Sequence, residues 1–186
     1  MDTTEVERRV LDAAEALFYE HGVQAVGMDR IRAASGVSLK RLYQGFPSKD
    51  TLVEACLRRR DRRWRDALAD HVELRPADRD RPLAVFDWLY EWFTEPDFRG
   101  CAFINAFGEL GTGSPAVADA VRDHKAEVHG YLLGLVRTAG VRDPERLAGQ
   151  LAVLVDGAIT TAAITGEPDA ACRARDAAAV LLAPAE

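Results

Sequence analysis

The chain has 186 residues, with 24 Lys and Arg against 30 Asp and Glu, which gives a formal net charge of −6 at neutral pH. Taken as a whole, this acidic balance is unusual for a nucleic-acid-binding protein, whose binding domain generally is basic. Hydrophobic residues make up 48% of the chain and charged residues 29%, a composition that excludes an intrinsically disordered chain. At this length the chain has room for one generous core or two small ones.

The cysteines and the hydropathy of the chain indicate in which cellular compartment the protein lies. Cys56, Cys101 and Cys172 lie far apart and form no CxxC pair, which excludes a disulfide framework and a cysteine-rich zinc site. The first residues are charged and contain no apolar stretch, so we expect no signal peptide. The most apolar window, residues 149–166, contains Asp156 and many small side chains, which favours a packed helix over a membrane span. We therefore expect a cytoplasmic protein without a metal or other cofactor.

The first part of the chain predicts three short helices. Apolar residues at steps of three and four predict a helix that begins at a capping box formed by Thr4 and Glu7 and ends at Gly22. Residues 28–35 predict a second helix, which Gly36 ends. Ser38 is a suitable cap for a third helix that extends to about residue 46. Three helices with a glycine at the turn between the second and third are typical of a helix-turn-helix domain.

Longer helices follow. Residues 48–72 predict one helix of roughly 37 Å, at about 1.5 Å per residue, and the polar, proline-containing residues 75–81 follow as a linker. The apolar side chains of residues 82–94 point in nearly all directions, which predicts a helix buried on more than one face. Four further helices are expected over residues 100–110, 114–138, 143–165 and 168–183. No stretch alternates as a strand would, so the predicted fold is all-α, with about nine helices.

The third helix carries the candidate DNA contacts. Leu42 and Phe46 lie four residues apart and are expected to point into the core of the small domain. The other faces carry side chains that can read base edges or contact phosphates, and we predict DNA contacts from Ser38, Lys40, Arg41, Tyr43 and Gln44.

Lys49 is the sixth candidate. It lies in the first turn of the long helix, where a cation opposes the helix dipole, so local stability does not explain it. A phosphate bound at that helix end would explain it. A solvated surface lysine is the alternative.

The charge is unevenly distributed. Residues 1–65 contain 13 Lys and Arg against 10 Asp and Glu, a net charge of +3, whereas residues 66–186 contain 11 against 20, a net charge of −9. The N-terminal region is therefore the basic part of the chain, as DNA binding requires. The arginine-rich run at residues 58–63 is interpreted as a solvated helix face, with pairing to acidic groups of the second domain as the alternative.

A set of residues at fixed spacing covers about residues 5–55 in register: Ala13, Ala14, Leu17, Phe18, Gly22, Ile31, Ser35, Gly36, Val37, Ser38, Leu42, Tyr43, Phe46, Ser48, Lys49 and Leu52. This pattern resembles the TetR family of one-component bacterial transcriptional regulators. Two positions depart from the pattern: Gly27 replaces a usual Thr that caps the second helix, and Lys40-Arg41 replaces a usual Gly-Thr.

The resemblance implies a two-domain regulator. Residues 1–47 would form the helix-turn-helix DNA-binding domain, and residues 48–186 the domain that binds a ligand and forms a homodimer. The ligand would lie among residues 82–138, where we expect contacts from Phe86, Trp88, Leu89, Trp92, Phe103, Asn105, Phe107 and His124. An ordinary aromatic core is the alternative for these residues.

The resemblance also implies dimerisation through the last two helices. One stripe rich in small and apolar side chains is the candidate interface: Leu147, Leu151, Leu154, Val155, Ala158, Ile159 and Ala162. Its alternative is packing within the same chain. A two-fold dimer would match a palindromic double-stranded operator whose half-sites lie about 34–36 Å apart.

The predicted function is a DNA-binding transcriptional regulator, expected to be a repressor that a small apolar or amphipathic ligand releases from its operator. The chain contains no glycine-rich phosphate loop, HExxH or GxSxG motif, so an enzyme is not predicted. Two alternatives are a ligand-independent DNA-binding protein and a redox-responsive regulator that acts through Cys101.

Overall fold

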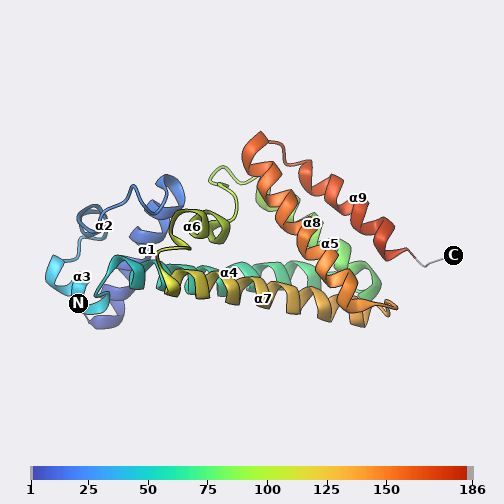
Figure 1. The fold of residues 1–186 in the computed structure, drawn as a ribbon, viewed down its shortest axis with the longest axis horizontal. Helices are drawn as coiled ribbons and strands as arrows, with labels where there is room; N and C mark the ends of the chain where they lie inside the picture. The colour runs from blue at the N-terminus through green and yellow to red at the C-terminus, as the bar shows by residue number, and fades with distance from the viewer. Residues whose placement is uncertain (1, 184–186) are drawn as a thin grey trace. The chain divides into compact units, whose positions relative to one another are not determined.

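The computed structural model describes residues 2–183 and contains nine α-helices, one short 3₁₀ helix and no strand among these residues (Figure 1). The helices are α1 (Thr3–His21), α2 (Met28–Ser35), α3 (Leu39–Gly45), α4 (Lys49–Glu73), η1 (Asp78–Asp80), α5 (Arg81–Phe93), α6 (Ala102–Leu110), α7 (Pro115–Thr138), α8 (Pro144–Thr165) and α9 (Ala170–Leu182). The all-α prediction is confirmed.

Local sequence sets the ends of the first helices. The Asp2 side chain, not the predicted box of Thr4 and Glu7, caps α1, because its Oδ1 accepts the Glu5 N–H at 3.1 Å. Gly36 ends α2 at φ 64°, a left-handed conformation that glycine adopts without steric cost. The Ser38 side chain accepts the Arg41 N–H at 3.4 Å and begins α3.

Prolines begin two later helices. Asp143 precedes Pro144, and its Oδ1 accepts the Arg146 N–H at 3.3 Å, as expected for the start of α8. Ser114 precedes Pro115 in the same way, but its Oγ is buried and contacts no hydrogen-bond partner in the described part of the chain. The serine side chain therefore does not cap α7.

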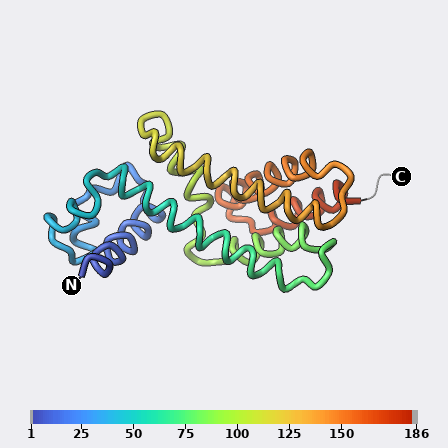
Figure 2. The backbone as a smooth tube through the Cα atoms, turned by 90° about the horizontal axis from the view of Figure 1, so that it is seen from below, coloured from blue at the N-terminus to red at the C-terminus, as the bar shows by residue number. Residues whose placement is uncertain are grey.

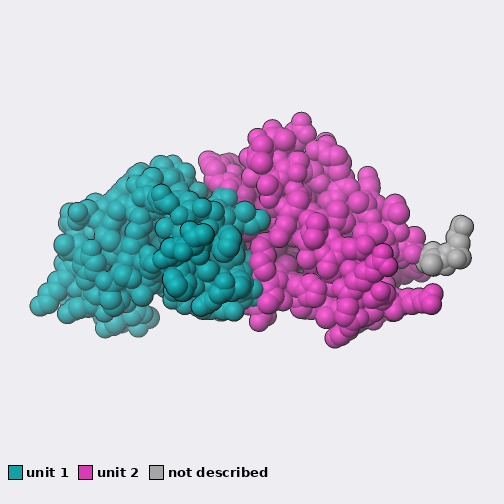
Figure 3. Space-filling model, viewed as in Figure 1, with its two compact units in different colours: residues 1–62, 102–124 teal, residues 63–101, 125–186 magenta. Residues whose placement is uncertain are grey.

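The helices group into two compact units (Figure 3). Unit 1 contains residues 2–62 and 102–124, and unit 2 contains residues 63–101 and 125–183. The chain passes from unit 1 to unit 2 within α4, returns to unit 1 at the start of α6, and enters unit 2 again within α7 (Figure 2). The domain boundary between residues 47 and 48 stays a prediction.

Unit 1 buries the expected apolar faces of the N-terminal helices. Val10 and Ala14 of α1 and Ile31 of α2 have no exposed surface, and Leu42 of α3 is likewise fully covered. Helix α1 packs against both α2 and α3. Because the short helices α2 and α3 are stabilised by the core that they share with α1 rather than by their own length, α3 is held in a defined position.

Two arginines of α4, Arg59 and Arg60, join that helix to α1, which contradicts the prediction of a solvated face at these two positions, whereas Arg62 and Arg63 are exposed as predicted. Arg59 donates to Glu15 Oε2 at 2.7 Å and to Asp12 Oδ1 at 2.7 Å, and its side chain is only 18% exposed. Arg60 lies 3.9 Å from the Tyr19 ring centroid. Burial lowers the pKa of Arg59, but the hydrogen bonds to the two carboxylates outweigh burial and leave this pKa above its usual value.

Unit 2 is formed around α5, which packs against α8 and α9. Its buried side chains lie on several sides of the helix, as the sequence predicts: Pro82, Ala84, Val85, Phe86, Leu89 and Phe93. Helix α8 is long and apolar enough to cross a membrane by length and composition alone, with 39% of its most apolar window buried inside the structure. The described part of the chain contains no second helix of this kind.

We expect the buried phenol of Tyr131, on α7, to make the folded protein less stable at alkaline pH. Burial, with a contribution from the Glu73 carboxylate, raises the pKa of its phenol from 10.0 to about 12. A raised pKa contributes stability that is complete below the unfolded pKa of about 10 and is lost as the pH rises through about 12. We expect a loss of about 1 kcal/mol, reduced from the full shift because water reaches part of the side chain.

The free energy of unfolding is measured by urea denaturation at pH 9 and at pH 11.5, for the wild-type chain and for Tyr131→Phe. The variant should show a smaller loss between the two pH values. Equal losses in both proteins would contradict the assignment to Tyr131.

Candidate nucleic-acid interface and ligand site

Helix α3 presents polar side chains on a firmly anchored backbone. Leu42 is fully buried and Phe46 is 8% exposed, so both predictions of core positions are confirmed. Lys40, Arg41 and Gln44 are exposed, and Tyr43 is 43% exposed. The helix can therefore place two cations, an amide and a phenol against a ligand outside the protein without disturbing its own packing.

Two more predicted DNA contacts lie at helix ends. Ser38 is exposed and uses its Oγ to cap α3. Lys49 is the first residue of α4, and its Nζ donates to the Gln24 carbonyl at 3.5 Å, in the loop between α1 and α2. Gly27, which precedes α2, supplies no side-chain cap to that helix. The loop from residue 22 to 27 therefore depends on contacts from other parts of unit 1.

Glu109 of α6 supplies those contacts. The sequence alone does not predict this role, because Glu109 lies more than 80 residues from the loop. Its Oε1 accepts the Val23 N–H at 3.0 Å and its Oε2 accepts the Gln24 N–H at 2.7 Å. The Gln24 side-chain amide donates in return to the Glu109 carbonyl at 2.7 Å. We call these three hydrogen bonds the Glu109 clamp. They join α6 directly to the loop that precedes the helix-turn-helix pair.

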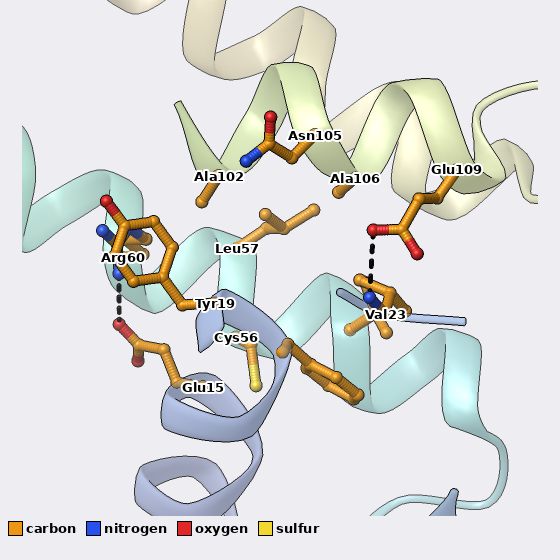
Figure 4. A pocket seen from close by; sticks show the side chains of 12 residues that line it. Glu15, Tyr19, Val23, Cys56, Leu57, Arg60, Ala102, Asn105, Ala106 and Glu109 are labelled. Carbon is orange, nitrogen blue, oxygen red and sulfur yellow. Dashed lines mark hydrogen bonds and ion pairs between the residues drawn. The ribbon is translucent and has the colours of Figure 1, made fainter. Parts of the chain in front are cut away.

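A small cavity of about 40 Å³ lies beside the clamp within unit 1 (Figure 4). Its wall is mostly apolar and comes from α1, α4 and α6, with Leu57, Ala102 and Ala106 among the lining residues. Polar groups at its edge include Asn105 and Glu109. A cavity of this size holds a few water molecules or a very small ligand rather than a drug-sized one.

The predicted ligand residues fall into both units. Phe103, Asn105, Phe107 and His124 belong to unit 1, and Phe86, Trp88, Leu89 and Trp92 belong to unit 2. Asn105 is the one that lines the small cavity. Phe107 is 47% exposed, whereas Phe86 and Leu89 are almost completely buried in the core of unit 2.

His124 is held by a network in unit 1. Its Nδ1 lies 2.7 Å from Asp61 Oδ1 of α4, and only 4% of its side chain is exposed. The Phe103 ring of α6 stacks on the imidazole with centroids 3.6 Å apart and an interplanar angle of 4°. These three side chains therefore join α4, α6 and α7.

Unit 2 contains a tryptophan cluster. Trp64 of α4 meets Trp88 edge-on at 5.0 Å between centroids, and Trp88 stacks on Trp92 at 5.6 Å. Phe98 extends the cluster by an edge contact with Trp92 at 5.1 Å. The three indoles are only partly buried. The cluster thus combines a packed aromatic surface with some access from solvent, which suits either a core or the wall of a ligand site.

The predicted dimer stripe on α8 is directed into its own unit. Six of its seven residues are buried within the single chain, and Leu154 is the partly exposed exception. Their burial favours the intramolecular alternative, and the assignment of this stripe to a dimer interface stays a prediction. The outward sides of α8 and α9 instead expose Val153, Ile164 and Val180, at 72%, 79% and 76%.

Comparison with known proteins bears directly on this architecture. A family model described as bacterial regulatory proteins of the tetR family matches residues 10–56, and one described as the tetracyclin repressor-like C-terminal domain matches residues 79–178. The chain belongs to the TetR family. A TetR-family transcriptional regulator from Streptomyces coelicolor shares 30% identity and superposes with a TM-score of 0.87, covering 96% of this chain and 95% of that one.

Two further relatives are also described as transcriptional regulators. A putative regulator of this type from Streptomyces avermitilis is 30% identical, with a TM-score of 0.78, and covers 94% of this chain and 98% of its own. An uncharacterized HTH-type transcriptional regulator of Mycobacterium tuberculosis is 41% identical over 75 residues. That match covers 38% of this chain and only 36% of the relative. The N-terminal helices are thus a TetR-type helix-turn-helix DNA-binding domain, in a family of transcriptional regulators that generally are not enzymes.

Proposed function

We propose that the protein is a cytoplasmic repressor that binds a palindromic operator as a homodimer and leaves it when a small apolar or amphipathic ligand binds. The observation that carries this proposal is the arrangement of α3, where Lys40, Arg41 and Gln44 are exposed while Leu42 and Phe46 hold the helix in the core. Arginine and lysine read guanine edges or phosphates, and glutamine reads adenine.

A second copy of the chain would cover the outward faces of α8 and α9. Val153 and Ile164 on α8 and Val180 on α9 are more than 70% exposed. Gly157, on the same side of α8 as Val153, has open space around it, so a second helix could approach closely. Covering this surface removes apolar area from water, and a two-fold pair matches the symmetry of a palindromic site.

Ligand release is proposed to act through α6. The Glu109 clamp and the stack of Phe103 on His124 both tie this helix to other elements of unit 1. A ligand that favours a shifted α6 would weaken the clamp and loosen the loop that carries the Gln24 carbonyl, the partner of Lys49. The ligand can move this equilibrium only by its difference in affinity for the two positions.

The experiment is fluorescence anisotropy of a labelled duplex from the region upstream of the protein's own gene, with a shuffled duplex as control. We expect tighter binding to the upstream duplex and a steep fall in affinity with salt, because phosphate contacts release counterions. A small-molecule panel added to the preformed complex then tests release. Equal binding to both duplexes would contradict operator recognition, and a complex that no ligand dissociates would favour the ligand-independent alternative.

A further inference from the structure

A groove of about 830 Å³ lies in unit 2, away from every side chain predicted to bind the ligand. It is lined by η1, the start of α5, the loop between α7 and α8, the start of α8 and the end of α9. Figures 1 and 2 show these segments side by side at the end of unit 2 where α9 finishes. Its volume is within the range of about 300–1,000 Å³ that is usual for small-molecule sites.

The floor of the groove is apolar. Leu83 of α5, Leu147 of α8 and Leu181 of α9 come together there from three different helices. Leu147 is 3% exposed and belongs to the core, whereas Leu181 is 39% exposed. A hydrocarbon chain placed on this floor would cover apolar surface that water now contacts, which favours binding.

The rim of the groove is cationic. Arg79, Arg142 and Arg146 line it, are exposed, and have side chains that form no hydrogen bond or ion pair with any residue from 2 to 183. Neighbouring arginines differ, because Arg81 pairs with Asp78 at 2.7 Å and Arg137 with Glu145 at 2.7 Å. The unpaired guanidinium groups are thus concentrated at the groove.

The lining contains three arginines against two aspartates, and neither carboxylate forms an ion pair with these arginines in the described part of the chain. Asp143 lines it as well, but one oxygen of its carboxylate accepts the backbone N–H of Arg146 at 3.3 Å as the cap of α8. Asp80 is exposed at the edge and forms no ion pair in the described part of the chain. Arg146 lies in the first turn of α8, where a cation opposes the helix dipole, and the carboxylates of Asp143 and Glu145 already lie at this helix end.

The loop that holds Arg142 has a defined conformation. The Gly140 N–H donates to the Arg137 carbonyl at 3.0 Å, and the Val141 N–H donates to the Val136 carbonyl at 3.2 Å. With Gly140 at φ 74°, these bonds form the Schellman motif that ends many helices. The backbone that carries Arg142 is therefore held in place beside the start of α8, which carries Arg146, and a ligand would have to order only the two side chains.

We propose that this groove binds an amphipathic anion, a carboxylate with an unbranched hydrocarbon chain. Arg142 and Arg146 would hold the carboxylate, because guanidinium groups pair with carboxylates through two parallel hydrogen bonds. The chain would lie on the floor formed by Leu83, Leu147 and Leu181. None of the aromatic residues expected to contact the regulatory ligand lines the groove, so this site is separate from the one proposed for operator release.

The test is isothermal titration calorimetry of the full chain with a series of straight-chain carboxylates from butyrate to decanoate, without DNA. Affinity should rise with chain length by about fourfold for each methylene that becomes buried. Decan-1-ol, which has the chain but not the charge, should bind at least about tenfold more weakly than decanoate. Equal affinity for butyrate and decanoate, or for decanoate and decan-1-ol, would overturn the proposal.

Variants locate the site. The double substitution Arg142→Gln and Arg146→Gln should weaken decanoate binding by at least about tenfold, because both charged donors are lost. Arg173→Gln is the control: it removes another exposed arginine of unit 2 that lies outside the groove lining, and binding should be unchanged. A circular-dichroism melt of each variant checks that the fold is retained. Unchanged decanoate binding by the folded double variant would place the ligand elsewhere and overturn the assignment, whatever the outcome of the operator experiment.

Discussion

Replacing Lys40 or Arg41 by alanine is expected to weaken operator binding by at least tenfold while the fold persists. A side chain that contacts a base edge contributes about 1–3 kcal/mol, and in a dimer each substitution removes two such contacts. Lys40 and Arg41 are exposed on α3, whereas Leu42 is the buried residue of this helix, so the core of unit 1 should not change. Anisotropy titrations of the upstream duplex at one fixed salt concentration measure the effect.

Arg62→Ala is the control for this experiment. Arg62 is an exposed arginine of α4 in the same unit, so its loss changes the net charge equally without altering α3. Its effect on operator affinity should be small and the same for the shuffled duplex. If Lys40→Ala and Arg41→Ala both bind the operator as tightly as the wild-type chain does, α3 is not the recognition helix.

Replacing Glu109 by alanine should destabilise the protein by about 2 kcal/mol and also weaken operator binding. The substitution leaves the Val23 and Gln24 N–H groups without the carboxylate that accepts them at 3.0 and 2.7 Å. A hydrogen bond to a charged group contributes about 1.5–3 kcal/mol, and water replaces part of that at the exposed Gln24. Operator binding should weaken because the loop between α1 and α2 becomes less ordered. Urea unfolding and anisotropy measure the two effects.

Two further variants separate the clamp from a simple loss of charge. Glu109→Gln retains one good acceptor, so its loss of stability should be about half that of Glu109→Ala. Glu7→Ala removes an exposed carboxylate from α1 in the same unit and should change stability by less than about 0.5 kcal/mol. If Glu109→Ala is as stable as Glu7→Ala, the clamp does not hold the loop.

Helical periodicity was not sufficient to predict which apolar side chains of α8 and α9 are exposed. The spacing of four residues between Leu147, Leu151 and Val155 correctly predicts an apolar face, yet α5 and α9 cover this face within the same chain. The same pattern is expected for a helix that packs on its own chain and for one that packs on a second copy. Only the positions of the neighbouring helices distinguish these cases.

The regional distribution of charge could be predicted from the sequence, but the contacts of individual charged residues could not. The split between a basic N-terminal region and an acidic remainder follows from the sequence, and it agrees with a DNA-binding domain at residues 10–56. The contacts that each charged side chain makes did not follow from the sequence. Arg59 and Arg60 were expected in solvent, but they lie against Glu15 and Tyr19 of α1. Their contacts are structural, and DNA contacts from the exposed side chains of α3 stay a prediction.

By itself, the sequence determined the nine helices, most of their ends, and the family, because caps, glycines and helical periodicity act over a few neighbouring residues. The tertiary structure decided which distant groups meet. Glu109 reaches a loop 86 residues earlier, and His124 reaches Asp61 across 63 residues. The unpaired arginines of the groove come together from η1 and the start of α8. Such pairs depend on how helices pack, and packing is a property of whole faces that no local pattern of residues specifies.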